Sequence, residues 1–211
     1  MQLNRITLIS TVHKEIGKCN SDELYKIIES INPDVIFLEA LKENYTNYDK
    51  ILFSQFGVYN ERLELKTIQT YSQNHTFEYV PVLNIGLSDE FETKIKIVSE
   101  NKDCQRLLDN YTFLELNGGF EFLNSKKSIV LQEEMRELEN RIIGNETIRQ
   151  KVNATIDAYE NSMIRNIYSF CKDKSFNMAI FMCGAAHRKS IIEKIKKLEI
   201  KLNWTLYNDT F

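Results

Sequence analysis

Short apolar runs alternate along the chain with longer stretches in which apolar residues recur every three or four positions. The runs at 6–9, 35–38, 77–83, 178–183 and 202–207 have the length and composition of buried strands. Helical spacing predicts helices between them, over 21–31, 44–56, 61–71, 87–100, 102–111, 131–142, 148–170 and 189–198. Strands that alternate with helices indicate an α/β fold with a mostly parallel sheet.

The first two strands are expected to form a βαβ unit. The helix over 21–31 ends before Pro33, and the second strand then runs into Glu39. Such a unit makes the two strands parallel with a right-handed crossover. His13 and Glu39 are therefore expected at the same edge of the sheet. Pro81 indicates that the third strand lies at a sheet edge or that the proline lies at a strand end.

A long helical hairpin is predicted before the late strand. One apolar stripe runs over 131–142 and a longer one over 148–170, separated by a break at Gly144. We expect this hairpin to pack against the sheet. Together with the loop around Asn44 and the flexible turn at 118–119, the hairpin is expected to border a pocket.

Two of the three histidines follow apolar strands at opposite ends of the chain. His13 and His187 each stand three residues after a small residue, Ser10 and Gly184. Ligands collect at the carboxyl ends of parallel strands, so these titratable side chains are candidates for a shared site. His75 lies in a polar loop and is interpreted as a surface residue.

Composition narrows the class of protein. The 211 residues, of which 43% are apolar, suffice for a sizeable core, and one domain spanning 1–211 is expected. A net charge of −3 does not favour nucleic acid as a partner. No run has membrane-spanning length, no signal peptide is recognisable, and the four cysteines are scattered. These features predict a cytoplasmic protein with reduced thiols and no membrane partner.

Glu39 is the most informative carboxylate, because it directly follows the apolar run 35–38. A buried carboxylate needs a cation, a metal or hydrogen-bond donors. Two imidazoles with one or two carboxylates could hold a divalent metal, or provide a general base with an orienting acid. Glu160, beside the apolar stripe of the second hairpin helix, is the second candidate carboxylate, although taken alone it is typical of a solvated helix residue.

Three segments together resemble the TIKI/TraB group, within the superfamily that also contains ChaN-like and erythromycin esterase-like proteins. They are STVH at 10–13, PDVIFLE at 33–39 and CGAAH at 183–187. The group has G-x-x-H after its first strand, a Pro-Asp strand that ends in Glu, and a second G-x-x-H after a late strand. ENSM at 160–163 also resembles the Arg-Glu-x-x-Met helix motif of the erythromycin esterase branch. Ser10 replaces the first glycine, and Tyr159 stands in place of the arginine, so that the anion-pairing contact expected of that arginine is in doubt.

The resemblance implies a three-layer α/β/α sandwich with its site at one sheet edge. It implies different chemistry in each branch. TIKI proteins are metal-dependent proteases, erythromycin esterases hydrolyse esters without metal, and ChaN binds haem. Family membership therefore predicts a site better than a reaction.

Three functional hypotheses follow. In the first, the protein is a hydrolase in which His13, Glu39 and His187, with or without Glu160, hold Mn, Zn or Co to activate water for attack on an amide or ester. In the second, His13 or His187 activates water without metal and is oriented by Glu39 or Glu160. In the third, the protein is a binding or regulatory module that retains the site without turnover. The expected substrate is a small molecule or a peptide.

Overall fold

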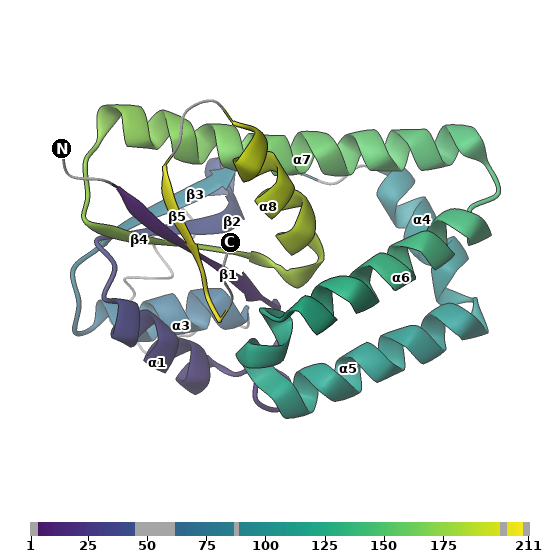
Figure 1. Cartoon of the computed structure of the whole chain (residues 1–211), viewed down its shortest axis with the longest axis horizontal. Coiled ribbons are helices and arrows are strands. Elements are labelled where there is room, and N and C mark those ends of the chain that lie inside the picture. Colours follow the sequence, from purple (N-terminus) through teal and green to yellow (C-terminus); the bar gives the residue numbers. More distant parts are fainter. Residues whose placement is uncertain (1–3, 45–61, 87–88, 199–201, 209–211) are drawn as a thin grey trace.

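A parallel sheet forms the centre of the structure (Figure 1). The computed structural model describes residues 4–44, 62–86, 89–198 and 202–208. Within these residues the strands are β1 (Arg5–Thr11), β2 (Val35–Leu41), β3 (Glu78–Leu83), β4 (Met178–Gly184) and β5 (Asn203–Leu206). They lie in the order β3-β2-β4-β1-β5, and every described pair is parallel. The predicted α/β class is confirmed, and β3 with its Pro81 lies at an edge as expected.

Helices cover both faces of the sheet and make a three-layer α/β/α sandwich. The helices α1 (Ser21–Ile31) and α3 (Leu63–Ser72) cover one face, and α7 (Glu146–Asp173) and α8 (Arg188–Lys197) cover the other (Figure 1). Side chains alternate across a strand, so Ile36 and Leu38 of β2 pack with α1 and α3, while Val35 and Phe37 pack with α7 and α8. Neighbouring residues of one strand thus reach opposite layers.

The helices α4 (Asp89–Ser99), α5 (Lys102–Leu123) and α6 (Lys126–Ile142) extend beyond the sheet (Figure 1). The predicted hairpin of α6 and α7 is present, and its break falls at 143–145 as expected. However, only α7 covers the sheet, whereas α6 packs mainly on α5. The expectation that the whole hairpin packs against the sheet is therefore wrong for its first helix.

The helix that begins at Lys102 is longer than the sequence predicts. It is expected over 102–111, whereas α5 runs to Leu123. At Gly119 the backbone is non-helical, with a φ of 58° and a ψ of −147°, so a kink interrupts the helix where the sequence predicts a turn at 118–119. The helix predicted over 44–56 lies almost wholly outside the described residues.

The pairing of β1 with β4 brings the two ends of the chain together. Ser10 lies opposite Cys183, and Thr11 lies opposite Gly184. The segments that follow these strands, with His13 and His187, therefore leave the sheet side by side at its carboxyl edge. The strand β2 is the other neighbour of β4 and is parallel to it, so Glu39 lies toward the same edge.

All four cysteines lie within the described residues, and none of them forms a disulfide. Cys19, Cys104 and Cys183 are buried, Cys171 is half-buried, and all four are free thiols. Among the described helices, none is both long and apolar enough to cross a bilayer.

Candidate active site

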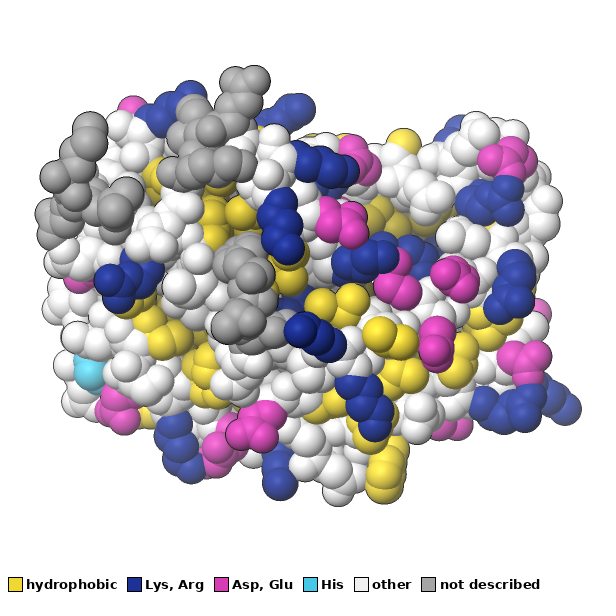
Figure 2. Space-filling view, in the orientation of Figure 1, with side chains coloured by type: hydrophobic (Ala, Val, Ile, Leu, Met, Phe, Trp, Pro, Cys, Tyr) yellow, Lys and Arg dark blue, Asp and Glu magenta, His cyan; other side chains and the backbone are white. Residues whose placement is uncertain are grey.

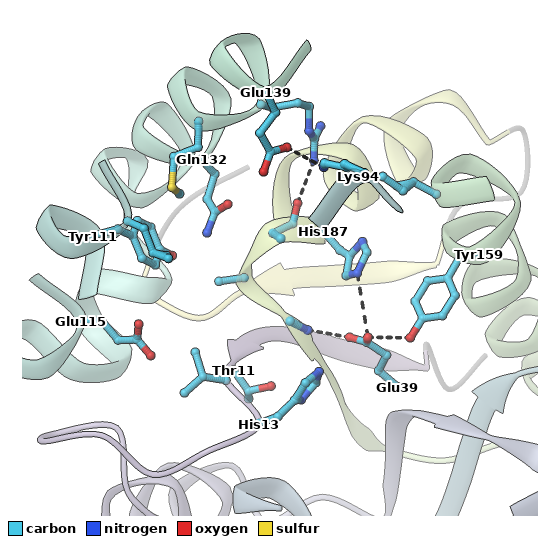
Figure 3. Close-up of a pocket in the computed structure, with 18 residues that line it drawn as sticks. Thr11, His13, Glu39, Lys94, Tyr111, Glu115, Gln132, Glu139, Tyr159 and His187 are labelled. Carbon is cyan, nitrogen blue, oxygen red and sulfur yellow. Dashed lines mark hydrogen bonds and ion pairs between the residues drawn. The ribbon is translucent and has the colours of Figure 1, made fainter. Parts of the chain in front are cut away.

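A cavity of about 520 Å³ opens at the carboxyl edge of the sheet, between the strand ends and the helices α5, α6 and α7 (Figure 3). His13, Glu39 and His187 line one part of it, as the sequence predicts for a shared site. Tyr111 and Glu115 of α5 line the opposite part. The hairpin of α6 and α7 borders the cavity as expected. The glycine pair at 118–119 lines a different groove, so that expectation is wrong.

His13 is oriented by Glu64, a carboxylate that the sequence analysis missed. His13 Nδ1 lies 3.0 Å from Glu64 Oε1, which also accepts a hydrogen bond from Thr11. Arg62 Nε donates to Glu64 Oε2. Burial alone raises the pKa of Glu64, but the hydrogen bond from His13 and the charge of Arg62 lower this pKa to about 2. Glu64 is therefore an ionised acceptor, and His13 must donate from Nδ1.

His187 is oriented in the same way by Glu160 of α7. His187 Nδ1 lies 2.9 Å from Glu160 Oε1, while Glu160 Oε2 accepts from the Ser190 hydroxyl and lies 3.6 Å from Lys194 Nζ. Burial lowers the pKa of His187, but the hydrogen bond to Glu160 and the charge of Glu39 outweigh burial and raise the pKa above its ordinary value. His187 therefore keeps its proton to a higher pH than a solvated histidine.

Glu39 lies within β2, and its carboxylate accepts two hydrogen bonds. Glu39 Oε1 accepts from the Tyr159 hydroxyl at 2.7 Å, and Oε2 accepts from the Gly184 backbone N–H at 2.6 Å. His187 Nε2 lies 3.9 Å from Oε1. Burial and the charge of Glu39 raise the pKa of Tyr159, so its hydroxyl remains a donor. Tyr159, at the position where the erythromycin esterase motif has arginine, thus contacts a carboxylate as a neutral donor.

Buried polar contacts place the segment with His187 against β1. Arg188 is fully buried and donates to the Ser10 hydroxyl, to Asn124 Oδ1 and to the Tyr207 carbonyl. Asn124 Oδ1 also accepts from the Ser10 N–H at 2.8 Å. Ser10, which replaces the glycine of the resembled motif, therefore has a structural contact of its own through its hydroxyl.

Ion pairs from α6 hold the same segment from outside. Glu133 accepts from Lys189 and from Arg136, and Arg136 also donates to the Ala186 carbonyl at 3.0 Å. Figure 2 shows basic and acidic side chains interspersed over the region of α6 and α8. The backbone beside His187 is thus fixed from both the sheet and the helical extension.

The four predicted site residues come together, but not as a metal centre. Within the described residues, no group of three or more His, Cys, Asp or Glu side chains is placed to hold a metal ion. Nδ1 of each site histidine contacts its own carboxylate, an arrangement that metal-binding histidines also show and that does not decide the question. Both oxygens of Glu39 accept hydrogen bonds from the protein. The set of His13, Glu39 and His187 therefore does not fit a metal as these side chains lie, and metal dependence stays a prediction of the sequence.

Glu39→Gln is expected to lower the free energy of unfolding by about 1–3 kcal/mol, because the neutral amide weakens or loses one of two charge-assisted hydrogen bonds. It should also lower the pKa of His187, since a negative charge near Nε2 is removed. Chemical denaturation and an NMR titration of the His187 ring measure the two effects. Glu43→Gln, an exposed change four residues away, is the control. Unchanged stability and titration in Glu39→Gln would contradict both roles.

Comparison with known proteins gives one weak structural similarity. No family model and no curated protein matches the chain. Among solved structures, the chain is similar to a mutant of the erythromycin esterase EreC in its open conformation, with a TM-score of 0.40 and 10% identity. The alignment covers 84% of this chain and 60% of that one, so the chain spans less than two thirds of the esterase structure. This similarity supports no argument about chemistry, and affiliation with the TIKI/TraB group stays a prediction.

Proposed function

We propose that the protein is a hydrolase that cleaves an ester or amide bond of a small molecule or peptide by histidine acid–base catalysis. One observation supports this proposal above the others. Two histidines border the same cavity, and Nδ1 of each is bound to a separate buried carboxylate. A carboxylate that orients an imidazole and stabilises its charged form is the arrangement that general base catalysis needs.

His13 is the proposed general base. Because the ionised Glu64 takes the Nδ1 proton as a hydrogen bond, neutral His13 has its lone pair on Nε2. Its side chain is half-exposed, so water can reach it. His13 Nε2 removes a proton from water as the water oxygen bonds to the substrate carbonyl carbon. Glu64 then stabilises the resulting imidazolium.

His187 is the proposed general acid. The hydrogen bond to Glu160 and the charge of Glu39 raise the pKa of His187 above its ordinary value, which favours the form that carries a proton on Nε2 as well as the one that Nδ1 donates. Its charge stabilises the tetrahedral oxyanion, and the Nε2 proton moves to the leaving oxygen or nitrogen as the carbonyl bond to that atom breaks. Water thus supplies one proton to His13, and His187 supplies one to the product.

The test is turnover of a panel of esters and anilides by chelator-treated protein, with elemental analysis of untreated protein. We expect hydrolysis that survives chelation, and we expect the rate to fall at alkaline pH as His187 loses its proton. Because the pKa of His187 is raised, this decline should begin at a higher pH than for a solvated histidine. Stoichiometric metal, with activity lost on chelation and restored by Mn, Zn or Co, would instead support the metal-dependent hydrolase. If untreated, chelator-treated and metal-supplemented protein all fail to hydrolyse any substrate of the panel, the result would support the binding module.

A further inference from the structure

We propose that Glu115 forms a subsite for a protonated amine of the substrate, at the side of the cavity opposite the two histidines. This inference rests on the proposed hydrolase function of the cavity and adds the chemical class of its substrate. Figure 3 shows Glu115 and Tyr111 of α5 across the cavity from His187, Tyr159 and Glu39.

The first argument is that Glu115 is buried without a partner for its carboxylate. The residue is only 8% exposed, and among the described residues no side chain makes an ion pair or hydrogen bond with its carboxylate. Glu39, Glu64 and Glu160 differ, since each accepts at least two hydrogen bonds or ionic contacts. The carboxylate reaches the cavity, but burial of most of the residue leaves it poorly hydrated and raises the pKa of Glu115, so the ionised form is costly without a partner. A ligand that supplies a positive donor would remove this cost.

The second argument is the charge of the surrounding wall. Lys94 and Arg136 also line the cavity, but Lys94 pairs with Glu139 and Arg136 pairs with Glu133. These pairs leave the charge of Glu115 uncompensated by a neighbouring cation. The site therefore favours a cationic group over an anionic one.

The third argument is the kind of substrate that the residues lining the cavity would fit. Tyr111 presents an aromatic ring beside Glu115, and a ring face also attracts a cation. Leu108 and Met135 supply apolar surface in the same cavity. The expected substrate thus has an amine at one end and, separated from it by an apolar segment, an ester or amide bond at the end near His13 and His187.

The primary test is binding, so that it does not depend on catalysis. Hexylammonium and its uncharged analogue hexanol are titrated calorimetrically into wild-type protein, Glu115→Gln and Asp109→Asn. Asp109 is an exposed acid on the same helix, and its replacement removes the same charge outside the cavity. We expect wild type to prefer hexylammonium, Glu115→Gln to bind it roughly tenfold or more weakly, and Asp109→Asn to match wild type. Equal binding by wild type and Glu115→Gln would overturn the inference.

A paired hydrolysis assay separates this inference from the proposed function. The substrates are nitrophenyl esters of aminohexanoate and hexanoate, which differ in the terminal amine. Both proposals are supported if wild type has a higher kcat/KM for the amino ester and Glu115→Gln loses this preference because its KM for the amino ester rises. Equal kcat/KM for the two esters in both proteins overturns the amine subsite and leaves the hydrolase intact. Selective hexylammonium binding without hydrolysis of either ester supports the amine subsite and overturns the hydrolase.

Discussion

Replacement of His13 by alanine is expected to lower kcat/KM by about 10²–10⁴-fold, the range typical of a lost general base. The fold should survive, because the side chain is half-exposed and its polar contact among the described residues is the one with Glu64. Glu64 would still accept hydrogen bonds from Thr11 and Arg62. Steady-state kinetics with the best ester of the panel, together with thermal melting, measure both expectations.

His75→Ala is the matched control for the loss of a histidine. His75 stacks on Tyr71 at 4.0 Å between ring centroids and does not line the cavity. Its replacement should leave kcat/KM unchanged. Added imidazole should partly restore His13→Ala, because the cavity is open to solvent at the position that the ring vacates. A His13→Ala variant within about twofold of wild type would exclude His13 as the base, since general base catalysis contributes far more.

The residues at the strand ends could be predicted because parallel strands bring their carboxyl ends to one edge. Short apolar runs indicate β1, β2 and β4, and this rule predicts that His13, Glu39 and His187 lie at one edge of the sheet, where they line a common cavity. The order of the strands in the sheet does not follow from these apolar runs. The adjacency of β1 and β4 joins segments more than 160 residues apart, and the sequence offered only their similar endings as a hint.

The partners of the histidines were harder to predict, because helix packing selects them. The spacing of these carboxylates from apolar residues nevertheless indicates that they face the core. Glu64 lies four and seven residues before Ile68 and Tyr71, so helical periodicity puts it on their buried face. Glu160 follows Ile156 by four residues and precedes Met163 by three, which places it on the apolar stripe rather than beside it. A carboxylate on such a stripe is therefore a candidate site residue, as is one that ends a strand.

The difference between a metal centre and two histidine–carboxylate pairs also lies beyond the sequence. The same residue types suit both arrangements, because imidazole and carboxylate bind metals and each other. In the structure Glu39 is directed toward Tyr159 and Gly184, and Glu160 toward His187 and Ser190, so both carboxylates accept hydrogen bonds from the protein. Metal dependence stays a prediction of the sequence.

Glu64→Gln is expected to lower the free energy of unfolding by about 3 kcal/mol at neutral pH, because it leaves Arg62 without its carboxylate and His13 without an ionised acceptor. The pH dependence gives a separate test. The folded state lowers the pKa of Glu64 from about 4.5 to about 2, so its contribution to stability is complete above about pH 4.5 and is lost as the pH falls toward about 2. That loss amounts to about 3 kcal/mol in wild type and should be absent from Glu64→Gln. Urea denaturation at several pH values between about 2 and 7 measures it.

Glu15→Gln is the control that separates burial from a lowered pKa. The pKa of Glu15 is also lowered to about 2, chiefly by its hydrogen bonds with Ser21 and Lys66. Glu15 and Lys66 are both more than one third exposed, so solvent screens the pair and Glu15→Gln should cost less than about 1 kcal/mol. If Glu64→Gln shows the same decline in stability between about pH 5 and 2 as wild type, Glu64 is not the carboxylate held ionised beside His13. The tautomer of His13, and with it the role of His13 as base, would then lose its support.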